Sequence, residues 1–147
     1  MKLTNKDLIE QFPWLDANPE SNEWVYGNAE SNCWFDNFEQ GWQDLGYEMC
    51  KEIQSVLEKY NLVDKFEVHQ IKEKYGELRF YWGFTKEDVD RSIFDELHEI
   101  DRKYENLSRR TCIVCGKPAK YITIGWILPY CENCVIPNWK IKKIYEN

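Results

Sequence analysis

The chain has 147 residues, of which 43% are hydrophobic and 16% aromatic, and 19 basic against 26 acidic side chains give a net charge of −7. This aromatic content excludes a disordered chain, because aromatic side chains bury enough surface to offset the entropy lost on folding. The sequence has no apolar run of the roughly 20 residues that a membrane helix needs, and residues 1–7 are too polar for a secretion signal, so we expect a soluble cytoplasmic protein.

The N-terminal part combines a short helix with an irregular segment. We expect a helix over residues 3–12, with Thr4 as N-cap and Asp7 three residues later. Pro13 ends it, because the residue before a proline avoids the helical conformation. Residues 13–37 read as irregular but contain five aromatic side chains. We expect that segment to pack across the core.

Two longer amphipathic helices are predicted on either side of a β-hairpin. Apolar residues recur every three to four positions over 38–60 and again over 87–107. Asn61 is the expected left-handed cap that ends the first of these helices, while Thr85 and Asp88 predict a capping box at the start of the second.

The hairpin is predicted from alternating apolar and polar residues. Residues 66–71 and 78–82 alternate in this way, and the residues around Gly76 have the composition of a turn. This alternation places Leu78, Phe80 and Trp82 toward the core and Arg79 and Tyr81 toward solvent. The predicted fold class is therefore α+β: two amphipathic helices flank a β-hairpin, and a C-terminal zinc ribbon-like module follows.

The charge changes sign near residue 109. Residues 109–147 hold seven basic and two acidic side chains, a net charge of +5, which leaves −12 for residues 1–108. We predict two domains with this boundary, an acidic α+β body over 1–108 and a basic zinc-binding module over 109–147. Such an asymmetry bears on partners more than on the fold.

Four of the six cysteines form the motif C-x2-C-x15-C-x2-C, whose members are Cys112, Cys115, Cys131 and Cys134. Two cysteines separated by two residues can turn both thiolates toward one ion, and this spacing is typical of structural zinc sites. Four sulfur ligands complete a tetrahedral shell and leave no open position for a substrate. We predict Zn²⁺ in a ribbon whose hairpin bends at Gly125, or in a treble clef if a helix follows the last cysteine.

There are three alternatives to a zinc site for these cysteines: an iron site, a redox pair and disulfide bonds. Sulfur ligation by itself does not distinguish zinc from iron. A thioredoxin-like redox pair needs a βαβ setting that residues 109–147 are too short to provide, and disulfides need an oxidising compartment. Cys33 and Cys50 have no neighbouring cysteine, and we expect both to be buried free thiols.

The sequence offers no catalytic constellation, so we predict that the chain is not an enzyme. His69 and His98 are its two histidines, and neither lies near a cysteine or a serine motif in the sequence. We expect both to be hydrogen-bonded or solvated. A metal-dependent enzyme would require a metal with an open coordination position.

A set of basic and aromatic residues is the candidate surface for a partner or for nucleic acid, because lysine and arginine neutralise phosphates and aromatic rings stack on bases. The candidate residues come from the hairpin and from the start of the module: Lys72, Lys74, Arg79, Tyr81, Arg109, Arg110, Lys117 and Lys120.

Residues 70–81, QIKEKYGELRFY, resemble the KEKfGgLRFY motif of a family of small phage and prophage proteins. Further matches are Gly41-Trp42, the run from Ser108 to Gly116, Gly125-Trp126 and the final cysteine pair. The chain departs from the family at Glu77, where the family tends to have a small residue. It also departs at Cys134, where some members have histidine.

The resemblance implies a phage context and no particular reaction. Small phage accessory proteins commonly bind host machinery, so the expected function is to bind and inhibit a host protein or ribonucleoprotein, such as a CRISPR effector, in the host cytoplasm. This is an argument by association. The alternative is a zinc-ribbon regulator that binds DNA or RNA directly.

Overall fold

The computed structural model describes residues 3–17, 33–135 and 141–143, and over these residues the chain is mixed helix and sheet. The α-helices are α1 (Asn5–Gln11), α2 (Gln43–Lys59) and α3 (Arg91–Arg109). Two small antiparallel sheets contain β1 (Phe66–Lys74) with β2 (Glu77–Phe84), and β3 (Tyr121–Thr123) with β4 (Pro129–Tyr130) and β5 (Ile141–Lys143). Within these ranges, no helix is both long and apolar enough to cross a bilayer.

The helix ends follow local capping chemistry. Thr4 is the N-cap of α1, as predicted, and it forms a capping box with Asp7, in which each side chain accepts the other residue's backbone N–H at 3.1 Å. Asn61 follows α2 with a φ of 56°, as predicted for a left-handed cap.

The predicted start of the last helix was wrong. The helix begins at Arg91, where the Asp90 side chain accepts the Ser92 N–H at 3.0 Å. Asp88, which was expected to lie inside the first turn, has a φ of 64° that is incompatible with a helix. Asp90 is therefore the N-cap, and the Thr85 hydroxyl, the predicted cap, donates instead to the Lys65 carbonyl oxygen at 3.3 Å.

The hairpin is longer than predicted and has a two-residue turn. Tyr75 and Gly76 have φ values of 55° and 80°, which are typical of a type I′ turn. Leu78 and Phe80 are buried and Tyr81 is exposed, as the alternation predicts. A register shift between Val68 and Gln70 adds one residue to β1.

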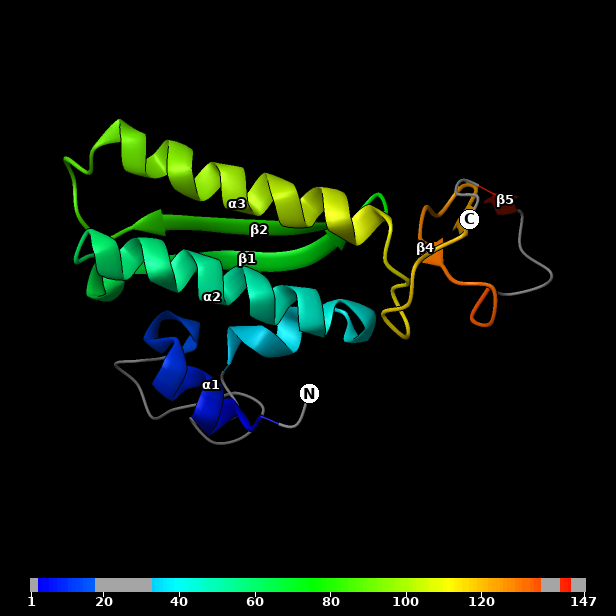
Figure 1. The fold of residues 1–147 in the computed structure, drawn as a ribbon, viewed down its shortest axis with the longest axis horizontal. Helices are drawn as coiled ribbons and strands as arrows, with labels where there is room; N and C mark the ends of the chain where they lie inside the picture. The colour runs from blue at the N-terminus through cyan, green and yellow to red at the C-terminus, as the bar shows by residue number, and fades with distance from the viewer. Residues whose placement is uncertain (1–2, 18–32, 136–140, 144–147) are drawn as a thin grey trace.

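The helices cover one face of the hairpin. Figure 1 shows α2 and α3 side by side along β1 and β2, with α1 beyond α2. The 3-10 helices η1 (Pro13–Leu15) and η3 (Trp34–Asn37) contact β1, and Trp14 and Phe35 within them are buried, so the described part of the 13–37 segment packs on the core as expected. Residues 18–32 lie outside the described residues.

The remaining 3-10 helices, η4 (Gln40–Trp42) and η5 (Val63–Lys65), precede and follow α2. Residues 38–42 were predicted to belong to the α-helix, but they contain η4, and Trp42 at its end is fully buried. Cys33 and Cys50 are buried free thiols, as expected. Burial raises the pKa of Cys33 to about 11 and also raises that of Cys50 well above its usual value.

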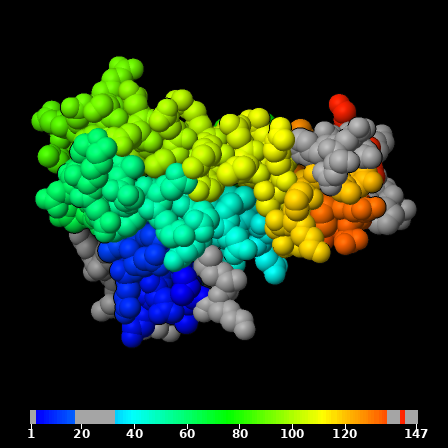
Figure 2. All heavy atoms as spheres, viewed as in Figure 1, coloured from blue at the N-terminus to red at the C-terminus, as the bar shows by residue number. Residues whose placement is uncertain are grey.

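The cysteine-bearing segment lies at the end of the molecule where the hairpin turns. Figures 1 and 2 show residues 110–135 as a lobe beyond the C-terminal end of α3. Gly76 in the hairpin turn approaches Ile127 so closely that a Cβ at this glycine would lie 3.0 Å from the Ile127 carbonyl oxygen. The lobe is therefore in direct contact with the tip of β1 and β2.

Candidate metal centre

The four cysteines of the motif converge. The Sγ atoms of Cys112, Cys115, Cys131 and Cys134 all lie within 4.8 Å of one another, and those of Cys115 and Cys131 are 3.5 Å apart. A tetrahedral ion with metal–sulfur bonds of about 2.3 Å needs S···S distances of about 3.8 Å. The cluster therefore fits a four-sulfur metal site.

The first knuckle is shaped by its own backbone. The Gly116 N–H donates to the Cys112 carbonyl oxygen at 3.0 Å, and the Cys112 N–H donates to the Lys117 carbonyl oxygen at 2.7 Å. Gly116 has a φ of 83°, a conformation that residues with a side chain rarely adopt. This tight turn brings Cys112 and Cys115 toward the same point.

The second knuckle is joined to the first by a short sheet. The Cys134 N–H donates to the Cys131 carbonyl oxygen at 3.2 Å. The N–H of Lys120 donates to the Tyr130 carbonyl oxygen, while that of Ile113 donates to the Pro129 carbonyl oxygen. The antiparallel pair β3 and β4 matches the predicted hairpin, and Gly125 in its bend has a φ of 94°. The treble-clef alternative concerns residues 136–140, which lie outside the described residues.

The thiols interact strongly with one another. Burial opposes ionisation of Cys131, but hydrogen bonds from Cys115, Cys134 and nearby backbone N–H groups outweigh it and lower its pKa to about 7. The hydrogen bond with Cys131, helped by burial, raises the pKa of Cys134 to about 12. Cys131 therefore loses its proton more readily than a free cysteine, and its thiolate is the form that binds a metal ion.

The donor set limits the chemistry. Four thiolates suit Zn²⁺ or iron, and geometry alone does not distinguish the two. With all four sulfurs bound, the ion would have no open position, so these residues would stabilise the fold and would not bind a substrate.

Two residues of the body, Gly41 and Trp42, here called the bracket, bind the backbone of the first knuckle. The Gly41 N–H donates to the Ile113 carbonyl oxygen at 2.9 Å, and the indole N–H of buried Trp42 donates to the Thr111 carbonyl oxygen at 3.0 Å. A Cβ at Gly41 would lie 2.0 Å from the Cys112 carbonyl oxygen. Gly41 and Trp42 thus have a structural role that their sequence positions do not reveal.

Two of the predicted partner-binding arginines are engaged within the protein. The side chains of Arg79 and Arg109 both donate to the carboxylate of Glu77, which is 6% exposed. Glu77, the departure from the family motif, therefore ties β2 to the end of α3. Sequence reasoning missed this role because the two arginines lie far apart in the chain.

The other predicted partner residues are spread over the hairpin and the module. Lys72 and Lys74 lie on β1 near its turn, and exposed Tyr81 is on β2. Arg110 directly follows α3, Lys117 is exposed beside the first knuckle, and the Lys120 ammonium lies 3.5 Å from the Glu132 carboxylate. Lys72 pairs with Arg79 across the hairpin, so these two residues share one of its faces, while Lys117 and Lys120 lie in the module.

The two histidines have hydrogen-bond partners, as expected. The His69 ring lies 3.0 Å from the Glu67 carboxylate, and the His98 ring lies 3.0 Å from that of Asp101, which also accepts the indole N–H of Trp82 at 2.9 Å.

An exposed apolar surface beside the metal centre was not predicted. Its most exposed members are Tyr75, at 70%, and Trp126, at 68%, with Val114 and Ile124 also exposed. Large apolar side chains that gather on a surface commonly mark an interaction site. In the sequence, Trp126 differs little from the apolar residues that follow it, so exposure could not be foreseen.

Comparisons with protein-family models, with curated proteins and with solved structures find no match to this chain. The function has to be inferred from the geometry described above.

Proposed function

We propose that this chain is a non-enzymatic binding protein whose metal-stabilised module presents an apolar surface to a macromolecular partner. The observation that carries this proposal is Trp126, a large side chain exposed on a loop that is itself well ordered by hydrogen bonds. The buried Thr123 hydroxyl donates to the Trp126 carbonyl oxygen and accepts the Leu128 N–H at 2.8 Å. Exposed aromatic side chains on rigid supports are frequent energetic centres of interfaces.

The resemblance to phage proteins narrows the choice of partner class. We propose a host defence component, most specifically a CRISPR effector complex that the chain binds and inhibits. The acidic body would favour approach to a basic partner surface, because complementary charge accelerates association.

The experiment compares Trp126→Ala with Leu3→Ala, since Leu3 is an exposed apolar residue near the N-terminus. In cells that carry an active CRISPR system, the wild-type chain and Leu3→Ala should lower interference, and the effector should co-purify with both. Trp126→Ala should fold normally and lose both effects. If Trp126→Ala binds and inhibits as well as the wild type, the proposed surface is wrong.

Direct nucleic-acid binding is the second candidate, favoured by the net charge of +5 over residues 109–147. A gel-shift assay with single- and double-stranded DNA and RNA tests it. Binding that is lost when Arg109, Arg110 and Lys120 are replaced, and that weakens steeply with salt, would support a regulator. Absence of any shift at low salt would remove this candidate.

A further inference from the structure

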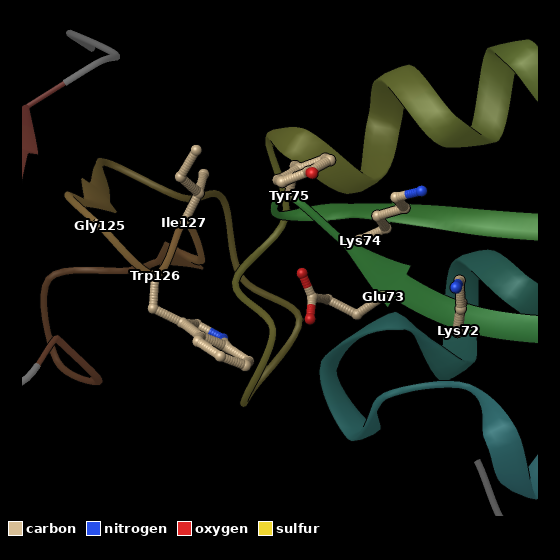
Figure 3. A pocket seen from close by; sticks show the side chains of 7 residues that line it. All are labelled: Lys72, Glu73, Lys74, Tyr75, Gly125, Trp126 and Ile127. Atoms are coloured by element: carbon tan, nitrogen blue, oxygen red, sulfur yellow. The ribbon is translucent and has the colours of Figure 1, made fainter.

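Two hollows flank Trp126 where the module meets the body. One, of about 310 Å³, lies between the hairpin turn and the 125–127 loop (Figure 3). The other, about 420 Å³ and here called the junction groove, is lined by Glu39, Gln40, Glu73, Ile113, Val114, Trp126, Leu128 and Tyr130. Trp126 and Glu73 line both hollows. The two hollows therefore lie on either side of the same two side chains.

The charged side chains that line the junction groove, Glu39 and Glu73, are both acidic. Figure 3 shows the Glu73 carboxylate directed toward Trp126, while the Lys74 side chain points away from it. The strand period of two turns the Lys72 and Lys74 side chains away from that of Glu73. Both lysines line the first hollow, but neither lines the junction groove. Partial burial and the nearby charge of Glu73 raise the pKa of Glu39. Among the described residues, neither carboxylate has an ion-pair partner that would neutralise it.

The surface is held in place before a partner binds. One oxygen of Glu73 accepts the Gly76 N–H at 2.9 Å, which fixes the carboxylate beside the turn. Thr123 fixes the loop that carries Trp126, and the close approach of Gly76 to Ile127 fixes the hairpin against that loop. A preorganised surface loses less conformational entropy when it binds a ligand.

We propose that the junction groove docks a basic segment of a protein partner, with an arginine or lysine side chain lying over the indole of Trp126 and between the carboxylates of Glu39 and Glu73. This inference rests on the proposed binding function and specifies the chemistry of the partner. The indole is the best aromatic surface for a cation, and a guanidinium can donate to two carboxylates while it stacks. Ile113, Val114 and Leu128 supply apolar contacts for the flanking residues.

Charge disfavours nucleic acid as the occupant of this groove. A nucleotide stacked on Trp126 would bring its phosphates toward Glu39 and Glu73, and like charges repel most where burial limits screening. The predicted nucleic-acid residues Lys72 and Lys74 line the hollow beside the hairpin turn and do not line the junction groove, whose charged side chains are acidic.

The experiment monitors the indole N–H resonance of Trp126, which is assigned by its loss in Trp126→Phe. The probes are the blocked peptide Gly-Leu-Arg-Leu-Gly, the same peptide with citrulline or with glutamate in place of arginine, and a 12-nucleotide oligo-dT. The arginine peptide should shift the resonance, and the double variant Glu39→Gln/Glu73→Gln should weaken its binding by roughly fivefold or more. Glu67→Gln, a carboxylate change elsewhere on β1, should leave peptide binding unchanged.

Equal binding of the arginine and citrulline peptides, or no effect of the double variant, would overturn the inference. A shift caused by oligo-dT and not by the arginine peptide would make the surface a nucleic-acid platform. The proposed function and this inference can be told apart. If partner capture depends on Trp126 but not on Glu39 and Glu73, the binding function stands and the cation-docking inference is wrong.

Discussion

The body and the four-cysteine module differ in what can stabilise them. In the body, large apolar side chains such as Trp42, Met49 and Leu57 are fully buried along α2 and its neighbours. In residues 110–135 the buried positions include two of the cysteines, and the strands are two or three residues long. Hydrophobic burial can stabilise the body, whereas so small a module would depend on a metal bound by its four cysteines and on the contacts of Gly41 and Trp42.

Removing one metal ligand tests this difference most severely. Cys131→Ser should abolish stoichiometric metal binding and unfold residues 110–135, because structural zinc supplies about 10 kcal/mol or more of folding free energy to such sites. The helical circular dichroism of the body should remain. Metal content by mass spectrometry and amide spectra by NMR measure the two effects.

Cys50→Ala is the matched control for the cysteine prediction. Cys50 is fully buried in α2 and is not part of the cluster, so this variant should lower the stability of the body and keep the metal. Full metal occupancy with an ordered module in Cys131→Ser would show that the module does not need its fourth ligand.

The bracket between the two regions is tested at Gly41. In Gly41→Ala the new Cβ would lie 2.0 Å from the Cys112 carbonyl oxygen, so the first knuckle would have to move. We expect a loss of about 3 kcal/mol, as for other overpacked sites, measured by urea denaturation. Gly125→Ala is the contrast, because a Cβ there meets open space and only the positive φ is unfavourable. It should cost about 1 kcal/mol, and equal costs at both glycines would contradict the bracket.

The sequence predicted the elements whose evidence is local. The apolar spacing of Met49, Ile53 and Leu57 predicted α2, the alternation around Leu78 predicted the hairpin, and the cysteine spacing predicted the cluster. Each of these patterns arises because residues at regular spacing in one short segment face the same core or the same ion.

Features built from distant segments could not be predicted in the same way. One such feature is the pairing of β5 with β3. Another is the groove that Glu39, Glu73 and Trp126 line together. In both cases the residues are far apart in the chain, and no spacing in the sequence indicates that they meet. The start of α3 was mispredicted for a different reason, because both Thr85 and Asp90 are residues that commonly cap helices and the sequence did not decide between them.

The buried carboxylate of Glu77 lies at the end of α3, where the body and the module join, and its removal tests how that junction is stabilised. Glu77→Ala leaves the guanidinium groups of Arg79 and Arg109 without their shared partner. We expect a loss of about 2 kcal/mol, less than for a fully buried pair because Arg109 is half exposed. A double-mutant cycle with Arg109→Ala measures the pairwise part, and Glu67→Ala on the exposed face of β1 is the control. Additive losses in the cycle would show that Glu77 does not couple the two elements.

The smallest effect concerns the body alone and depends on pH. The Tyr104 hydroxyl on α3 donates to the Glu52 carboxylate on α2, and the Lys103 ammonium lies 2.7 Å from the same carboxylate. Burial opposes the charge of Glu52, but these two hydrogen bonds outweigh it and hold its pKa below the usual value of 4.5. A carboxyl group with a lowered pKa stabilises the folded state above pH 4.5, and this contribution disappears as the pH falls through its folded-state pKa.

Tyr104→Phe removes one of those hydrogen bonds and should therefore lower stability by about 1 kcal/mol at pH 7. The difference from the wild type should shrink as the pH is lowered below 4.5, because protonation of Glu52 weakens the bond in the wild type as well. Thermal unfolding between pH 7 and pH 3 measures it, with Tyr81→Phe as the exposed control. Because Glu52 and Tyr104 lie on α2 and α3, metal content should be unchanged at pH 7. A pH-independent difference would mean that Tyr104 stabilises the body by packing and not through the Glu52 charge.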